Sequence, residues 1–143
     1  MIFSRIDLSK TNYNKMKDGA WGIIEYPDMS QLSDIYKKYC RHKNFKSVMP
    51  LFASDFGNPC HEIIGYMSND QLVAFSIIKI LDNANAECMQ FAWDYADPSL
   101  RLGIKSLEHE CAWFKERGYQ YLYLGGADQY KTNFNGFEIL GPL

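Results

Sequence analysis

Two groups of residues within one central stretch of the chain, 86–126, could act on a substrate. Trp93 and Asp94 lie near the end of its first part, and Tyr123, Gly125 and Gly126 end its last part. The rings of Trp93 and Tyr123 could stack on an acyl group or a base. The Asp94 carboxylate could bind an amine or accept its proton. Two successive glycines would let a ligand approach the backbone. The alternatives are a turn-capping role for Asp94 and a flexible strand exit at the glycines.

The elements that would position these residues are a strand, a helix and a second strand. The predicted spans are Ala86–Tyr95, Asp97–Arg117 and Tyr119–Leu124. Asp97 is suited to cap the N-terminus of the helix, followed by Pro98 at the first helical position, and Gly118 suits the C-terminal cap. Such a helix, with a strand on each side, is expected to pack on a sheet.

The predicted helix has one apolar stripe. Its members recur at spacings of three and four residues and are Leu100, Ile104, Leu107, Cys111 and Phe114. Glu108, Glu110 and Glu116 fall outside the stripe, so the pattern predicts that all three carboxylates are exposed to solvent.

The preceding chain predicts an antiparallel meander. Its strands are His61–Met67, Gln71–Leu81 and Ala86–Tyr95, separated by short turns of polar residues. Gln71–Leu81 is almost continuously apolar, which is typical of a central strand covered on both faces. The helix after the third strand leads to Tyr119–Leu124, and this crossover predicts a parallel pair.

Upstream and downstream segments complete the predicted fold. We expect an edge strand at Met1–Asp7, a polar loop at Leu8–Ala20, a short strand at Trp21–Tyr26 and a helix from Ser30, as its cap, to about His42. The apolar residues of Asn44–Pro59 suggest a lid or a short helix, and Phe137–Leu140 could supply a further strand. The predicted fold class is therefore α/β (α+β): a mixed sheet with a meander, a crossover helix and a parallel strand.

Composition narrows the function classes. A chain of 143 residues fits one domain, 1–143, and a net charge of -2 lacks the overall signature of a nucleic-acid binder. The N-terminus lacks the apolar run of a signal peptide, and no stretch is long and apolar enough to predict a membrane span. A basic helix end includes Lys37, Lys38, Arg41, His42, Lys43 and Lys46; it could complement the helix dipole or contact phosphate or RNA.

The cysteines indicate reduced thiols in a cytoplasmic protein rather than a metal site. Cys40, Cys60, Cys88 and Cys111 are widely spaced, and no pair of motifs has the spacing of a structural zinc site. We therefore predict no metal.

The order of several motifs resembles the GNAT acyltransferase core, and within it the C-terminal part of arginyl-tRNA–protein transferases. The segments that carry the likeness are Leu72-Val73-Ala74-Phe75, Trp93-Asp94-Tyr95-Ala96-Asp97-Pro98, Leu102-Gly103, Tyr121-Leu122-Tyr123-Leu124-Gly125 and Tyr130-Lys131. They occur in the family's order between about Ser30 and Leu140.

This resemblance implies transfer of an acyl or aminoacyl group to an amine, such as a protein or peptide N-terminus. It suggests three catalytic residues, Asp94, Tyr123 and Tyr130. The implied substrate-binding residues are Trp93, Tyr95, Gly125, Gly126, Asp128 and Lys131, and those for the donor are Arg101, Gly103 and Lys105.

The residues at the start of the predicted helix Asp97–Arg117 indicate which acyl donor the protein uses. In CoA-using relatives small residues there let backbone amides approach the pyrophosphate, whereas this chain keeps Gly103 and places Lys105 where a small residue belongs. Aminoacyl-tRNA is therefore the favoured donor and acetyl-CoA the weaker alternative. A non-catalytic GNAT-like binding protein is the other hypothesis, and the oligomeric state is left open.

Overall fold

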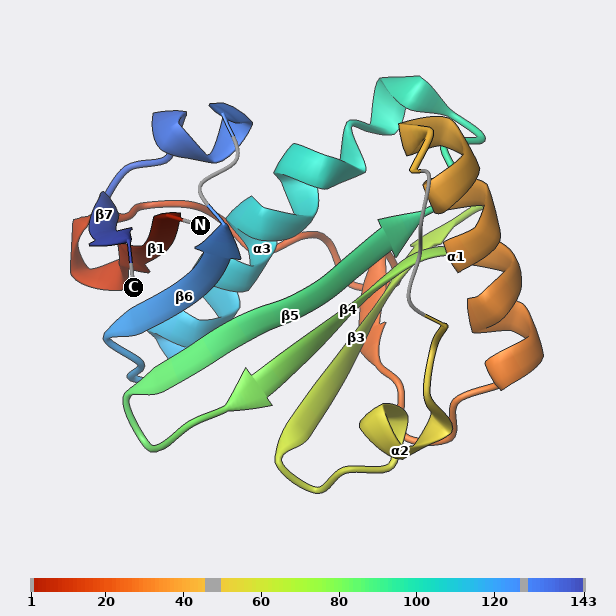
Figure 1. Cartoon of the computed structure of the whole chain (residues 1–143), viewed down its shortest axis with the longest axis horizontal. Helices are drawn as coiled ribbons and strands as arrows, with labels where there is room; N and C mark the ends of the chain where they lie inside the picture. Colours follow the sequence, from red (N-terminus) through yellow and green to blue (C-terminus); the bar gives the residue numbers. More distant parts are fainter. Residues whose placement is uncertain (1, 46–49, 127–128, 143) are drawn as a thin grey trace.

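The computed structural model describes residues 2–45, 50–126 and 129–142, and its centre is a seven-stranded mixed sheet (Figure 1). The strands are β1 (Ile2–Asp7), β2 (Trp21–Ile23), β3 (His61–Ser68), β4 (Gln71–Ile80), β5 (Asn85–Trp93), β6 (Tyr121–Gly126) and β7 (Phe137–Pro142). Their spatial order is β2-β3-β4-β5-β6-β1-β7. All neighbours pair antiparallel except β5 and β6, which are parallel as predicted.

Helices cover both faces of the sheet (Figure 1). The longer ones are α1 (Met29–Lys43) and α3 (Leu102–Glu116); the short elements are α2 (Ala53–Phe56), η1 (Leu8–Lys10), η2 (Pro98–Leu100) and η3 (Gln129–Asn133). One core joins Leu32 and Ile35 of α1 to Phe75 and Ile77 of β4. A second core joins the other face of the sheet to α3. The prediction that β4 is a central strand covered on both faces is therefore confirmed.

The meander forms because its turns suit a hairpin. Asn69 and Asp70, between β3 and β4, have φ angles of 51° and 63°. A two-residue hairpin turn of type I′ has positive φ at both central residues, and its twist matches that of the flanking strands. Asn and Asp tolerate positive φ better than most residues. The predicted turn after β3 is thus confirmed.

β1 is not the edge strand that the sequence suggested. It lies between β6 and β7 and pairs antiparallel with both. Phe137–Leu140 does form part of a strand, β7, and this strand covers the outer edge of β1. Ile6 of β1 is fully buried in the same core as Leu107 and Phe114 of α3.

Both long helices begin at other residues than predicted. Asp97 does act as a cap, but for η2: its Oδ1 accepts a hydrogen bond of 3.1 Å from the backbone N–H of Ser99. Arg101 then adopts a left-handed conformation with φ 48°, so α3 begins only at Leu102. In α1 the cap is Asp28 rather than Ser30, because its side chain accepts from two backbone N–H groups of the first turn.

Helix α3 is buried on more than its apolar stripe. The predicted loop Leu8–Ala20 includes η1 and packs against α3: Met16 donates its backbone N–H to His109 Nδ1 at 2.9 Å, and Lys115 Nζ donates to the carbonyl of Thr11. Glu116 is exposed as predicted, whereas Glu110 is only 3% exposed. The prediction that Glu110 is solvated was wrong, since helix periodicity alone shows neither this second covering layer nor the polar partners across the sheet.

No helix within the described ranges is long and apolar enough to cross a membrane. The four cysteines are free thiols.

The contact between β1 and the turn before β7 gives a test of the fold. A Cβ on Gly136, whose φ is 78°, would lie 2.4 Å from the carbonyl oxygen of Asp7, whereas a Cβ on Gly118, whose φ is 88°, would meet nothing within 4 Å. Both Gly→Ala changes should cost about 1–2 kcal/mol of unfolding free energy because L-residues disfavour this conformation. Gly136→Ala should cost clearly more in urea unfolding, because of the added clash. Equal losses for the two variants would contradict this packing of β1.

Candidate active site

The candidate site lies where β5 and β6 diverge. The two strands pair only at Asn85–Tyr121, Ala86–Leu122 and Glu87–Tyr123, although β5 continues to Trp93 and β6 to Gly126. Within the described residues, the edge of β5 beyond Glu87 therefore has no strand partner on this side. The Gln90 side-chain amide donates to the Phe91 carbonyl at 3.0 Å, and backbone groups of this edge that no protein group pairs are open to water or a ligand.

A bulge alters β5 at this point. Gln90 pairs with Ile77 of β4 and Cys88 pairs with Ile78, so Met89 is an extra residue without a counterpart. Bulges bend a strand and re-aim its side chains and backbone groups. The bulge and the divergence of β5 from β6 together open the sheet next to α3.

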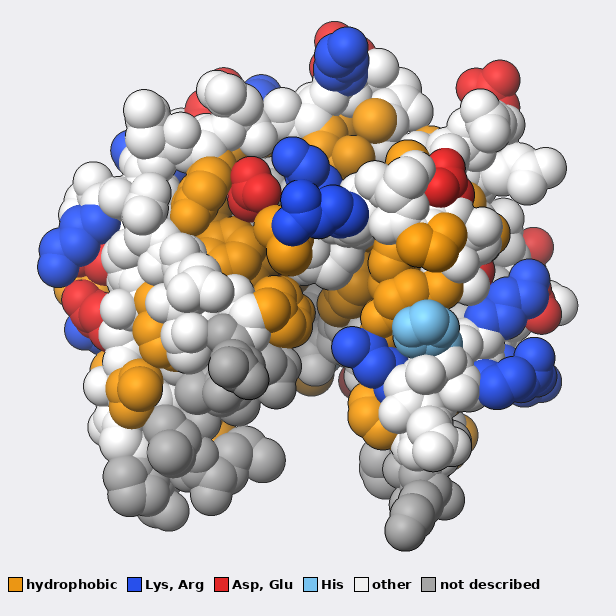
Figure 2. All heavy atoms as spheres, turned by 90° about the horizontal axis from the view of Figure 1, so that it is seen from above, with side chains coloured by type: hydrophobic (Ala, Val, Ile, Leu, Met, Phe, Trp, Pro, Cys, Tyr) orange, Lys and Arg blue, Asp and Glu red, His pale blue; other side chains and the backbone are white. Residues whose placement is uncertain are grey.

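The opening forms a groove with two compartments, which we call the wedge groove. The inner compartment has a volume of about 170 Å³ and the outer one about 500 Å³. Four residues line both and so connect them: Tyr39, Phe91, Gly103 and Tyr130. Figure 2 shows the molecule hollowed on this upper side, with hydrophobic side chains exposed in the hollow and Lys or Arg side chains near it.

Glu110 of α3 is the buried acidic residue of the inner compartment. Its Oε2 accepts hydrogen bonds from the hydroxyls of Tyr66 on β3 and Ser76 on β4, the latter at 2.8 Å. Its Oε1 lies 3.7 Å from the Cys88 thiol on β5. Three neighbouring strands thus supply a donor to one carboxylate.

Burial dominates the ionisation of this group. It raises the pKa of Glu110 from an ordinary 4.5 to about 7, against the opposing effects of the three hydrogen bonds and the positive charge of Lys131. Burial, and then the Glu110 charge, raises the pKa of Tyr66 well above its usual range. Near neutral pH Glu110 can therefore accept or release a proton, while Tyr66 stays a donor. This is the ionisation expected of a general acid–base group.

Aromatic rings and cations line the outer compartment. Tyr95 stacks on the ring of His42, with centroids 3.6 Å apart, and lies 4.2 Å from the ring of Trp93. Lys43 and Arg101 also line this compartment. Tyr95 and Arg101 both have positive φ, at 55° and 48°. Such an arrangement can stack a planar group and hold a phosphate beside it.

Six of the residues predicted from sequence line the wedge groove. They are Trp93, Tyr95, Arg101, Gly103, Tyr130 and Lys131. The basic end of α1 contributes Lys43. Lys46, which belonged to the same basic stretch, lies outside the described residues, as does Asp128.

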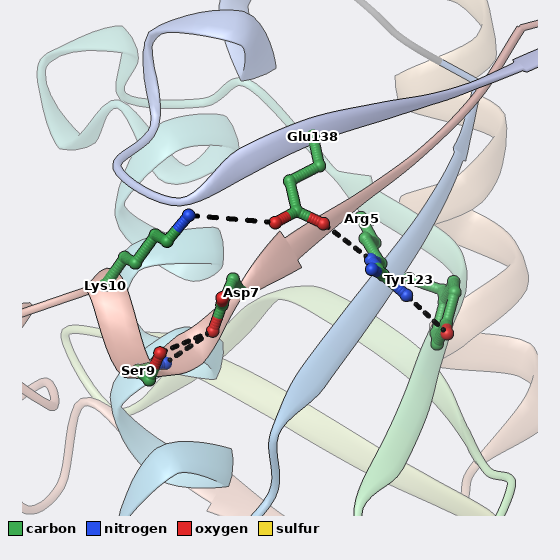
Figure 3. Close-up of polar contacts among 6 residues, drawn as sticks. All are labelled: Arg5, Asp7, Ser9, Lys10, Tyr123 and Glu138. Atoms are coloured by element: carbon green, nitrogen blue, oxygen red, sulfur yellow. Dashed lines mark hydrogen bonds and ion pairs between the residues drawn. The ribbon is translucent and has the colours of Figure 1, made fainter.

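Other predicted residues lie elsewhere. Asp94 lines a separate cavity beside the first turns of α1, and its Oδ1 accepts from the backbone N–H of Ala96 at 2.9 Å, which is the turn-capping alternative. The hydroxyl of Tyr123 accepts a hydrogen bond of 3.2 Å from Arg5, which also binds Glu138 (Figure 3). Lys105 is exposed and lines neither compartment.

The two glycines of β6 take part in strand pairing. Gly125 pairs with Ser4 and Gly126 pairs with Phe3 of β1. Gly125 has a φ of 70°. Both glycines therefore belong to the pairing of β6 with β1, and Gly125 lines neither compartment of the wedge groove.

Sequence reasoning missed Glu110, Tyr66 and Ser76, although a signal was present. Ser76 is the one polar residue in the apolar run from Leu72 to Ile78. Glu110 follows Gly103 and Leu107 at spacings of four and three, so it borders the apolar stripe to which Leu107 belongs. A hydroxyl in a buried strand together with a carboxylate at the border of a sheet-facing helix stripe predicts a buried polar pair.

The raised pKa of Glu110 gives a prediction about stability. The folded state binds this proton more tightly than the unfolded chain does, so the contribution is present below about pH 4.5 and is lost as the pH rises through about 7. Between pH 5 and 8 the wild type should lose about 3 kcal/mol of unfolding free energy relative to Glu110→Gln.

Urea unfolding of both proteins at several pH values measures this difference. The buried His109, whose pKa is lowered to about 4, contributes stability that falls with decreasing pH, but it does so in both proteins. If the unfolding free energies of wild type and Glu110→Gln changed equally with pH, a buried, titrating Glu110 would be contradicted.

Comparisons with known proteins agree with this fold. Among solved structures, L-PGS from Bacillus licheniformis superposes with a TM-score of 0.66 at 15% identity, covering 88% of this chain and 46% of its own. A GNAT-family protein from Novosphingobium aromaticivorans has a TM-score of 0.59 at 14% identity, with 96% and 58% covered. The ribosomal-protein-S18-alanine N-acetyltransferase from Escherichia coli has a TM-score of 0.59 at 20% identity, with 73% and 64% covered.

These structural likenesses establish a GNAT-like fold. The chain spans less than half the length of L-PGS. A search of curated protein sequences gave no match. The family described as "Arginine-tRNA-protein transferase, C terminus" matches residues 24–141, which hold β3 to β6, α3 and both compartments of the wedge groove. The chain therefore belongs to the family defined by the C-terminal region of arginine-tRNA–protein transferases.

Proposed function

We propose that this chain transfers an aminoacyl group from aminoacyl-tRNA to the amine of a protein or peptide N-terminus, with the reaction in the wedge groove. Family membership supports an acyl or aminoacyl transferase. The observation that carries the assignment of the site is the Glu110 carboxylate, buried at the inner compartment with a pKa of about 7.

The chemistry joins an amine nitrogen to the ester carbonyl carbon of the donor and breaks the bond to the ribose oxygen. Glu110 accepts the proton that the attacking amine loses, and the same proton then passes to the departing ribose oxygen. The oxyanion formed in between needs hydrogen-bond donors that are fixed in advance. Backbone N–H groups on the unpaired edge of β5, around the Met89 bulge, are suited to this task.

The outer compartment is suited to the 3′ end of the donor. A base can stack among the rings of Trp93 and Tyr95, and Arg101 and Lys43 can neutralise phosphates. The donor's ester would then reach the inner compartment past Gly103, where an added Cβ would meet nothing within 4 Å. This arrangement supports aminoacyl-tRNA as donor.

The other polar residues of the groove have supporting roles in this proposal. Lys131 lies where its charge lowers the pKa of Glu110, so it can also attract the acidic groups of a substrate. Tyr130 borders both compartments, and its hydroxyl is a candidate to relay the proton from Glu110 to the departing oxygen: it donates its own proton and is reprotonated by Glu110. We favour Glu110 over Asp94 and Tyr123 as the proton acceptor, because those two lie outside the groove.

Replacing Glu110 tests its chemical role. In Glu110→Gln the side chain keeps its size but no longer accepts a proton, so the transfer rate should fall about 10²–10⁴-fold while donor affinity changes little. The assay follows a labelled amino acid from charged tRNA to a peptide N-terminus, with acetyl-CoA as an alternative donor. Transfer at the wild-type rate by Glu110→Gln would refute the proposed base. Tight donor binding without transfer by the wild type would favour a binding protein instead.

Filling the groove tests its location. A Cβ on Gly103 meets nothing within 4 Å, and Gly103 lines both compartments, so the indole of Gly103→Trp should occupy the passage and abolish transfer and donor binding. Its melting temperature should stay near that of the wild type, because glycine is unfavourable inside a helix. Glu116→Trp, on the exposed last turn of the same helix, is the matched control and should transfer normally. Normal transfer by Gly103→Trp would place the reaction elsewhere.

A further inference from the structure

The two oxygens of the Glu110 carboxylate have different surroundings. Oε2 accepts from two hydroxyls, those of Tyr66 and Ser76, while Oε1 has the Cys88 thiol at 3.7 Å as its neighbour. A hydroxyl is a strong donor and a thiol a weak one. Ser76 and Cys88 both line the inner compartment, so both carboxylate oxygens lie beside it. Two donors saturate the lone pairs of Oε2, whereas Oε1 keeps acceptor capacity.

We propose that Tyr66 and Ser76 are positioning residues, forming a clamp that fixes Oε2 of Glu110 and leaves Oε1 as the atom that exchanges the proton with substrate. This inference rests on the catalytic role proposed above for Glu110. It adds which oxygen acts and which residues, on two strands remote from the groove mouth, hold it in place.

Burial makes this clamp rigid. Tyr66 is fully buried, Ser76 is 1% exposed and Glu110 is 3% exposed. The Tyr66 ring packs edge-on against the rings of Phe91 and His109, with centroids 6.5 Å and 5.9 Å apart. A carboxylate held by two fixed donors cannot rotate to exchange its oxygens without leaving a buried hydroxyl unpaired, which is unfavourable.

The titratable groups around the carboxylate keep the clamp in one state. Tyr66 on β3 has a pKa well above its usual range, and burial also raises the pKa of Cys88 on β5, so both remain protonated near neutral pH. Next to it on α3, Cys111 has a pKa raised by burial, and His109 has a lowered pKa. Lys131 of η3 supplies the positive charge that acts on Glu110.

A carboxyl-carbon NMR titration of labelled Glu110 in the free protein tests the clamp without any substrate. Tyr66→Phe removes one donor to the charged form, so the apparent pKa of Glu110 should rise by about one unit. Ser76→Ala should act in the same direction and serves as the second variant if Tyr66→Phe destabilises the protein. Tyr119→Phe, a half-buried tyrosine whose ring packs on Phe114, is the matched control and should leave the pKa unchanged.

Cys88→Ala tests the difference between the two oxygens. Because the thiol is a weak donor to Oε1, its loss should move the pKa of Glu110 less than either hydroxyl variant does. An equal or larger effect of Cys88→Ala, or an unchanged pKa in both Tyr66→Phe and Ser76→Ala, would overturn the clamp.

Transfer kinetics then connect the clamp to the reaction. In wild type the transfer rate should rise as Glu110 ionises. In Tyr66→Phe the pH range of this rise should move to higher pH together with the NMR titration, and activity should recover at high pH. A purely structural role would lower the rate without moving this range, and would overturn the positioning role. A moved titration combined with unchanged kinetics in Glu110→Gln would instead refute the proposed function, since the clamp would then hold a non-catalytic group.

Discussion

The structure depends on one buried carboxylate held by a helix and three strands. Glu110 of α3 reaches across the core to Tyr66, Ser76 and Cys88, which lie on β3, β4 and β5. An ionisable group in such a place is unfavourable unless its hydrogen bonds are satisfied. The meander therefore does more than form a hydrophobic face, because each of its strands contributes one polar atom to the surroundings of the Glu110 carboxylate. The position of α3 against the sheet is fixed by these contacts as well as by its apolar stripe.

The same region is also where the sheet opens. β5 and β6 pair over three residues and then separate, and the bulge at Met89 lies just beyond their last pair. The opening exposes the inner compartment to substrate while the hydroxyl partners of Glu110 stay buried. A carboxylate at the boundary between core and groove has the raised pKa that burial causes and the access that proton transfer needs.

Local signals in the sequence were sufficient for most of the fold. The turn at Asn69 and Asp70, the apolar run of β4 and the crossover into β6 gave the correct meander and the parallel pair. Local signals failed to predict the positions of elements that are covered by segments distant in sequence. Nothing near β1 in the sequence shows that β7 returns to cover its edge, and nothing near α3 shows that the segment containing Met16 covers its second side. Twelve site candidates between Trp93 and Lys131 were predicted from the order of motifs and from their positions in the predicted fold, and six of them line the groove. Glu110 was missed because a glutamate outside an apolar stripe is usually solvated, and its partners are 22 to 44 residues away in sequence.

The central claim is that Glu110 accepts the proton during aminoacyl transfer in the wedge groove. Single-turnover transfer from saturating charged tRNA, measured against pH with a weakly basic amine as acceptor, tests it most directly, since the acceptor is then unprotonated throughout. The account predicts a rate that rises with an apparent pKa near 7 and then levels off, as the buried carboxylate ionises. A rate that does not depend on pH in this range, or the same rise in Glu110→Gln, would contradict it.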